Sequence, residues 1–122
     1  MRILYHDPVP VAQFVEHDLQ LEFVSKEQLL LEADFVSIHV PLSDATRKLI
    51  GEPELMLMKT TAILVNTARG PVVASAAVAQ ARAAHWYGGA ASYGFQREPE
   101  VHPGMMQHDT VCRGPRLDRA LR

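Results

Sequence analysis

Apolar residues follow two alternating spacings along most of the chain, and this alternation predicts strands separated by helices. Short apolar runs that end at proline, glycine or polar residues predict strands at 2–6, 21–24, 34–40, 62–65 and 88–95. Apolar residues spaced three or four apart, or an alanine-rich run, predict helices at 11–19, 25–33, 53–59 and 73–84. Strands that alternate with helices favour a parallel sheet, so the predicted fold is α/β, doubly wound, with helices on both faces.

Two local signals mark where predicted helices begin. Ser25 begins the run Ser-Lys-Glu-Gln, in which its hydroxyl can cap the amide of Gln28 while the Gln28 side chain reaches back. Pro53 suits the first turn of the helix that follows it. After Gln96 neither period continues, so we expect one domain over 1–111 and a loose tail over 112–122.

Composition limits the classes of function. The 122 residues suffice for one domain with a hydrophobic core, and the net charge of −2 with 48% hydrophobic residues is ordinary for a soluble protein. No basic patch favours a nucleic-acid partner. The apolar runs are far shorter than the roughly 20 residues that span a bilayer, so we expect no membrane partner and a cytoplasmic location. Cys112 is the only cysteine, and no histidine spacing suits a metal site.

The most specific segment of the sequence is 65–73, which reads Val-Asn-Thr-Ala-Arg-Gly-Pro-Val-Val. It closely resembles the strand-end motif of D-isomer-specific 2-hydroxyacid dehydrogenases, the family of glyoxylate and hydroxypyruvate reductases. The resemblance implies that Arg69 holds the carboxylate of a small 2-keto acid, which a planar guanidinium suits better than an ammonium group. It also implies contacts with the cofactor, NAD, for Asn66, Thr67 and Ala68.

Further segments resemble the same family in the same order along the chain. Val40, Pro41 and Thr46 look like the stretch that passes under the adenosine half of NAD. Asp7 is similar to the acidic residue at a strand end that binds the ribose hydroxyls and favours NAD over NADP. Glu98 resembles the family glutamate that orients the catalytic histidine. The resemblance therefore implies part of a Rossmann-type domain of an enzyme that transfers hydride between NAD(H) and a 2-keto or 2-hydroxy acid.

Three departures from the family pattern argue against turnover by this chain alone. The family's glycine-rich phosphate loop precedes the strand that corresponds to the first strand here. Tyr93 stands where the family has an aspartate for the nicotinamide carboxamide. Arg116 aligns with the family's catalytic histidine, and arginine cannot exchange a proton near neutral pH. We therefore expect a fragment that is inactive alone.

Several simpler interpretations remain open. Asp7 before Pro8 is also a common turn residue, Arg69 could pair with a nearby acid, and Glu98 could be a solvated loop carboxylate. The chain could then be a non-catalytic remnant that binds adenosine weakly or serves a structural role. A flavodoxin-like signalling module is a further alternative, but it needs acids after the third strand, where the sequence has Val40 and Pro41.

The resemblance also leads to an expectation about the order of the strands in the sheet. A Rossmann sheet has the order 3-2-1-4-5-6, and the family's central first strand precedes this sequence. We predict either that the flanking strands close up into the flavodoxin-like order 2-1-3-4-5, or that a homodimer covers the exposed edges.

Overall fold

The computed structural model describes residues 1–84, 89–92 and 111–113. The strands are β1 (Ile3–Tyr5), β2 (Leu21–Phe23), β3 (Phe35–Ile38), β4 (Ile63–Asn66), β5 (Gly89–Ser92) and β6 (Val111–Arg113). The helices are α1 (Gln13–Leu19), α2 (Lys26–Glu32), α3 (Glu52–Leu57) and α4 (Ser75–Ala83), with a 3-10 turn η1 (Gly70–Val72). Every strand pair is parallel. The predicted α/β class and parallel pairing are therefore confirmed.

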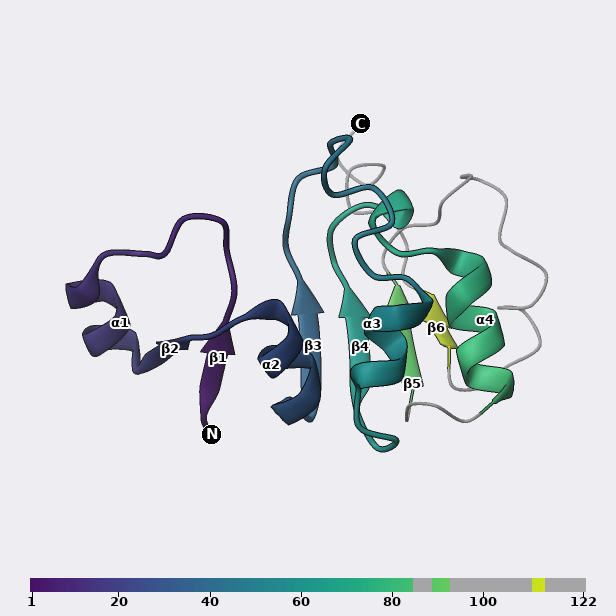
Figure 1. Ribbon diagram of the computed structural model, residues 1–122, viewed down its shortest axis with the longest axis horizontal. Coiled ribbons are helices and arrows are strands. Elements are labelled where there is room, and N and C mark those ends of the chain that lie inside the picture. The colour runs from purple at the N-terminus through teal and green to yellow at the C-terminus, as the bar shows by residue number, and fades with distance from the viewer. Residues whose placement is uncertain (85–88, 93–110, 114–122) are drawn as a thin grey trace.

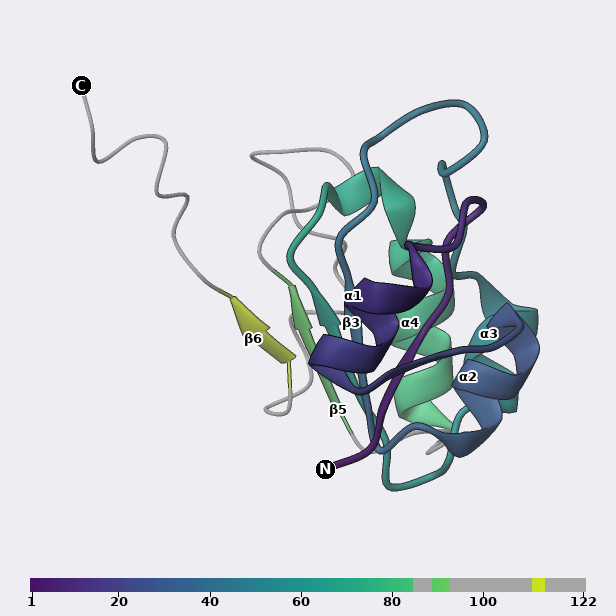
Figure 2. The same ribbon diagram turned by 90° about the vertical axis from the view of Figure 1, so that its left-hand side faces the viewer.

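The larger sheet has the order β3-β4-β5-β6, with β4 paired on both sides. Leu64 in β4 lies in register with Val36 of β3 and Ala90 of β5. Helices α2, α3 and α4 lie together on one face of this sheet (Figure 2). We expected helices on both faces, whereas these three helices of the described chain cover the same face.

Side-chain burial in β3 and β4 alternates as the one-sided covering requires. Val36 and Leu64 are buried, whereas Phe35 and Ile63 point to the other face and are 69% and 36% exposed. Since successive side chains of a strand point to opposite faces, the helices cover the face that carries Val36. The core consists of the following residues: Leu30, Val36, Ile38, Ile50, Leu55, Met58, Ala62, Leu64, Val72, Val73, Val78 and Ala81.

Strands β1 and β2 form a separate two-stranded sheet beside the larger one (Figure 1). Because β1 has no ladder with β3, the predicted closure into the order 2-1-3-4-5 is wrong. Contacts at the start of β1 favour this separate arrangement. The Arg2 guanidinium bonds to the carboxylates of Glu22 and Glu32, each at 2.7 Å, and so ties β1 to β2 and α2. These ion pairs are exposed, so each contributes only little to the free energy of folding.

The predicted helix starts are confirmed, apart from one side chain. The Ser25 hydroxyl accepts a hydrogen bond from the Gln28 amide at 3.1 Å, and Pro53 lies in the first turn of α3. We predicted that the Gln28 side chain reaches back to the start of the helix, and this is wrong. It donates instead to the Glu32 carboxylate at 2.8 Å. A bond to a charged acceptor one turn along the helix is stronger than one between neutral groups, which explains the difference.

A strand at the predicted start of the tail was not expected. Strand β6 pairs with β5 through Val111 and Ala90, and through Cys112 and Ala91. The sheet therefore continues across the predicted limit between 111 and 112. A three-residue strand has too few positions to establish an alternating pattern, and its pairing depends on a distant neighbour.

Within the described chain, none of the helices has the length and apolar character that a membrane span requires.

The central position of Leu64 leads to a prediction about stability. We expect Leu64→Ala to reduce the free energy of unfolding by about 2–5 kcal/mol, because the side chain is only 2% exposed. Ile63→Ala is the matched control, since Ile63 lies next in the same strand but on the uncovered face, and it should cost roughly 1 kcal/mol or less. Urea unfolding measures both. Equal losses for the two variants would contradict the one-sided core.

A partly buried ion pair joins α2 to the start of α3. Lys26 Nζ lies 2.9 Å from Glu54 Oε1, and the Gly51 amide donates to Glu54 Oε2 at 3.0 Å. Burial alone would raise the pKa of Glu54, but the bonds from Lys26 and from backbone amides outweigh it, so the pKa is lowered.

This lowered pKa gives the pair a defined pH dependence. Its contribution to stability is fully present above the pKa of an unfolded glutamate and is lost as pH falls through the lower folded pKa. We expect Glu54→Gln to reduce the thermal midpoint at pH 7 and to approach the wild-type midpoint in acid. Glu52→Gln is the control, because Glu52 is exposed in the same helical turn. A constant difference between wild type and Glu54→Gln from pH 7 to pH 3 would contradict the assignment.

Candidate functional site

The carboxyl ends of β1, β3 and β4 lie at the same edge of the molecule (Figure 1). The segments that leave this edge begin at His6, His39 and Thr67. Ligands of open parallel sheets bind beyond the carboxyl ends of the strands, so this edge is the candidate site. Most of the site residues predicted from the sequence lie here, whereas Glu98 falls outside the described residues.

Asn66, the last residue of β4, shapes the loop that follows it. The residue is 3% exposed, and the two polar atoms of its side chain bond to the backbone of Ala68 and Arg69. Asn66 Nδ2 donates to the Arg69 carbonyl at 3.2 Å, and the Ala68 amide donates to Asn66 Oδ1 at 3.1 Å. A buried amide is stable only when its polar atoms are bonded, so Asn66 and the loop fix one another.

Thr67 joins the loop after β4 to the end of β3. Its hydroxyl lies 2.8 Å from the Ile38 carbonyl and 3.0 Å from His39 Nδ1. A carbonyl can only accept, so the hydroxyl donates to Ile38 and His39 Nδ1 donates to the hydroxyl. His39 Nε2 of the neutral ring then accepts from the Ser37 hydroxyl at 2.8 Å. The bonds thus assign the His39 tautomer.

Sequence analysis gave His39 no separate role. Its place directly after a predicted strand was the signal that could have drawn attention to it, because that is where ligand-facing side chains of parallel sheets lie. The bond to Thr67 required knowledge of which strands are neighbours. That knowledge came only with the fold.

The loop after β3 contains Val40, Pro41 and Thr46, and a hydroxyl network holds it. Thr46 Oγ1 donates to the Pro41 carbonyl at 2.6 Å and accepts from the Ser43 amide at 2.8 Å. Val40 is half-buried against the core. The structure thus brings these three predicted cofactor residues into one loop, with the Thr46 hydroxyl already engaged in holding it. Their contacts with a cofactor stay a prediction.

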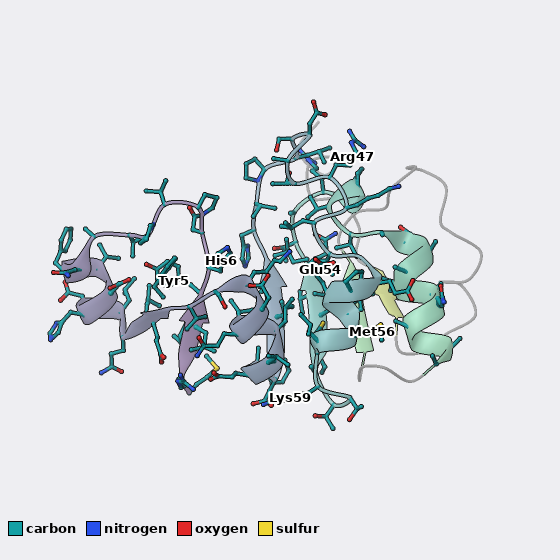
Figure 3. All side chains as sticks on the ribbon, in the orientation of Figure 1. Tyr5, His6, Arg47, Glu54, Met56 and Lys59 are labelled. Atoms are coloured by element: carbon teal, nitrogen blue, oxygen red, sulfur yellow. The ribbon has the colours of Figure 1, made fainter. Side chains whose placement is uncertain are left out.

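Arg69 has an exposed side chain that makes no hydrogen bond or ion pair with any other described residue. The same holds for Arg47 and Lys48 in the neighbouring loop, and Figure 3 shows Arg47 at this edge. The remaining lysines within 1–84 are paired, Lys26 with Glu54 and Lys59 with Asp34. The carboxyl edge of the larger sheet therefore presents unpaired positive charge.

Asp7 lies at the end of β1, in the smaller sheet. Its Oδ1 accepts a hydrogen bond from the Val9 amide at 3.0 Å, as its interpretation as a turn residue requires. Its Oδ2 makes no hydrogen bond or ion pair with the described residues. The structure places Asp7 at the same edge as Arg69 but does not bring the two into contact.

His6 precedes Asp7 and was also missed by the sequence analysis. His6 Nδ1 lies 2.9 Å from the Val24 carbonyl, so this nitrogen carries the hydrogen. The ring stacks on Phe23 with centroids 6.0 Å apart. His6 thus fixes the chain just before Asp7. Within the described ranges, no group of three histidine, cysteine, aspartate or glutamate side chains could hold a metal ion.

Comparison with known proteins gives consistent matches. The family described as D-isomer specific 2-hydroxyacid dehydrogenase, NAD binding domain, matches residues 1–116. A glyoxylate reductase of Korarchaeum cryptofilum is 50% identical over 99 residues, which are 81% of this chain and 30% of the relative. A glyoxylate reductase of Thermococcus litoralis is 38% identical over 120 residues, which are 98% of this chain and 36% of the relative.

A solved structure agrees with these relatives. D-mandelate dehydrogenase of Rhodotorula graminis, in its holo form, superposes with a TM-score of 0.89 at 32% identity, over 93% of this chain and 33% of that chain. The chain spans about a third of the length of the proteins that it matches. The match of the family over 1–116, together with the Rossmann-type neighbour, means that this chain belongs to the D-isomer-specific 2-hydroxyacid dehydrogenase family and corresponds to its NAD-binding domain.

Proposed function

We propose that this chain is part of a dehydrogenase of the glyoxylate or hydroxypyruvate reductase type, which transfers hydride between NAD(H) and a 2-keto or 2-hydroxy acid. The observation that carries the proposal is the unpaired Arg69 guanidinium, presented by a loop that the buried Asn66 shapes. The glyoxylate reductases among the relatives support the choice of a small 2-keto acid as substrate.

Arg69 would hold the substrate carboxylate. A guanidinium presents parallel N–H donors that match the two oxygens of a carboxylate, and it stays charged at any physiological pH. Arg47 would add attraction for an anion at this edge, although its side chain is exposed and its charge is screened by salt. Thr67 and Asn66 would keep the loop in one geometry by the bonds already described.

When bound, NADH would donate hydride to a 2-keto acid and NAD⁺ would accept it from a 2-hydroxy acid. The described residues fit the adenosine half of the cofactor best. Asp7 Oδ2 is available to accept from a ribose hydroxyl, while Oδ1 holds the turn. Val40 and Pro41 would lie against the adenosine, as in the family motif. Tyr93 and Arg116 replace the family's nicotinamide-binding aspartate and catalytic histidine in the sequence, so we propose no turnover from the chain alone.

A non-catalytic remnant that binds adenosine is the second candidate. The free Oδ2 of Asp7 favours it, because this acceptor does not depend on the nicotinamide half of the site.

We also propose a homodimer, for which the exposed apolar side chains of Phe14, Leu19 and Phe23 give support. The end of β3 carries Val40 and Pro41 instead of acids, so no observation favours a signalling module.

Titration with AMP tests the adenosine half of the proposal. We expect saturable binding of AMP, and Asp7→Asn should weaken it by about tenfold, because the amide keeps the turn but loses the charged acceptor. Asp44→Asn removes the same charge from another exposed position at this edge and should leave affinity unchanged. Calorimetry measures all three. Absence of AMP binding, or equal losses in both variants, would reject the role of Asp7.

NADH oxidation with glyoxylate tests the expectation about turnover. We expect a rate far below about 1 per second, which is the lower end of ordinary enzyme turnover. A rate near that value would show that other groups replace the family's histidine and would overturn the proposed inactivity.

A further inference from the structure

Lys48 has a backbone conformation that lysine rarely adopts. Its φ is 54°, and Gln20, with φ 52°, is the other non-glycine residue with positive φ in the described chain. Gln20 ends α1, where a left-handed residue is common. Lys48 instead lies between β3 and α3, within the turn that the Leu49 amide closes on the Thr46 carbonyl at 3.1 Å. Such a position favours glycine or asparagine, so its geometry needs an explanation from the surroundings.

The backbone around Lys48 bonds to the segment that follows Arg69. The Lys48 amide donates to the Pro71 carbonyl at 2.8 Å, and the Ile50 amide donates to the Val72 carbonyl at 3.2 Å. The Ala74 amide donates back to the Ile50 carbonyl at 2.9 Å. Residues 48–50 therefore support 71–74 as a short additional strand would.

Arg69 lies between this support and the one that Asn66 provides. Its carbonyl accepts from Asn66 Nδ2 and from the Val72 amide at 3.0 Å. Gly70 and Val72 are buried, whereas the Arg69 side chain is exposed. The backbone of Arg69 is thus held on both sides, which fixes the point and the direction in which its side chain leaves the loop. Of the two supports, only the one at Lys48 depends on an unusual φ.

We infer that Lys48 is a positioning residue for Arg69, and that it acts through its left-handed backbone rather than through its ammonium group. The inference rests on the proposed role of Arg69 in holding a carboxylate. A residue that disfavours positive φ would shift the Lys48 amide away from Pro71 and loosen η1, directly after Arg69. Glycine adopts positive φ without strain, so it would keep the support although it removes the charge.

Oxalate is a suitable probe, because it offers the adjacent oxygens of a 2-keto acid. Binding is followed by NMR through the Nε–H signal of Arg69 in ¹⁵N-arginine-labelled chain, with Arg69→Lys to assign the signal. We expect Lys48→Val to weaken oxalate binding by about tenfold, since small misplacement of a binding group has large effects. Lys48→Thr should act in the same direction, because threonine is also branched at Cβ, and it is the variant to use if Lys48→Val does not fold. Lys48→Gly should stay within about twofold of wild type.

Gln20→Val is the matched control, because it places the same side chain at the other left-handed residue, far from Arg69 in the fold. It should lower the thermal midpoint without changing oxalate binding. Weakening by Lys48→Gly equal to that of Lys48→Val would assign the effect to the ammonium group and overturn the inference. Equal weakening by Gln20→Val would assign it to general instability and also overturn it.

Failure of the proposed function is distinguishable from failure of this inference. If oxalate leaves the Arg69 signal of the wild-type chain unchanged, the role of Arg69 as a carboxylate holder is wrong. The positioning role of Lys48 is then tested without ligand, by comparing the backbone amide signal of Arg69 in the wild-type chain and in the variants. A shift in Lys48→Val that is absent in Gln20→Val supports the inference, and no shift in either variant overturns it.

Discussion

Strand β4 has to pair on both sides and bury one face at the same time, and the rest of the described structure depends on this constraint. Leu64 fills the core beneath the helices, and parallel neighbours bond to both edges of the strand. Because parallel strands end at a common edge, the loops after β3 and β4 must lie side by side. Asn66, the last residue of the strand, is both buried in the core and bonded to the loop. Packing and site geometry therefore meet at one residue.

The N-terminal unit, residues 1–24, depends much less on a core of its own. Val24 is its one buried residue, and α1 buries none. A two-stranded sheet with a single helix has little apolar surface to remove from water, so its place must come from connections to the remainder. Arg2 supplies one of these through Glu32.

Periodicity predicted the sequence of strands and helices because burial on a helix face or a strand face leaves a regular trace. The Ser25 cap followed from a short local pattern, and the loop from Asn66 to Arg69 followed from resemblance to a family motif. The separation of the two sheets did not follow, because the Arg2 bonds join residues distant in sequence. The same reason applies to β6 and to the bond between Thr67 and His39.

The backbone conformation of Lys48 could not be predicted from the sequence for a different reason. A positive φ at lysine leaves no mark in the sequence, since glycine or asparagine would be the expected residue. It becomes visible only when its amide is seen to reach Pro71. Burial likewise cannot be predicted from one strand alone: Phe35 is the largest apolar residue of β3, yet it lies on the uncovered face.

The central claim is that the loop shaped by Asn66 presents Arg69 to a carboxylate. A crystal structure of the chain with oxalate tests it most directly. The account predicts oxalate with both oxygens of one carboxylate on the Arg69 guanidinium, and a loop whose Asn66 bonds are unchanged. Oxalate bound only at Arg47 or Lys48, with Arg69 unoccupied at saturating concentration, would contradict it.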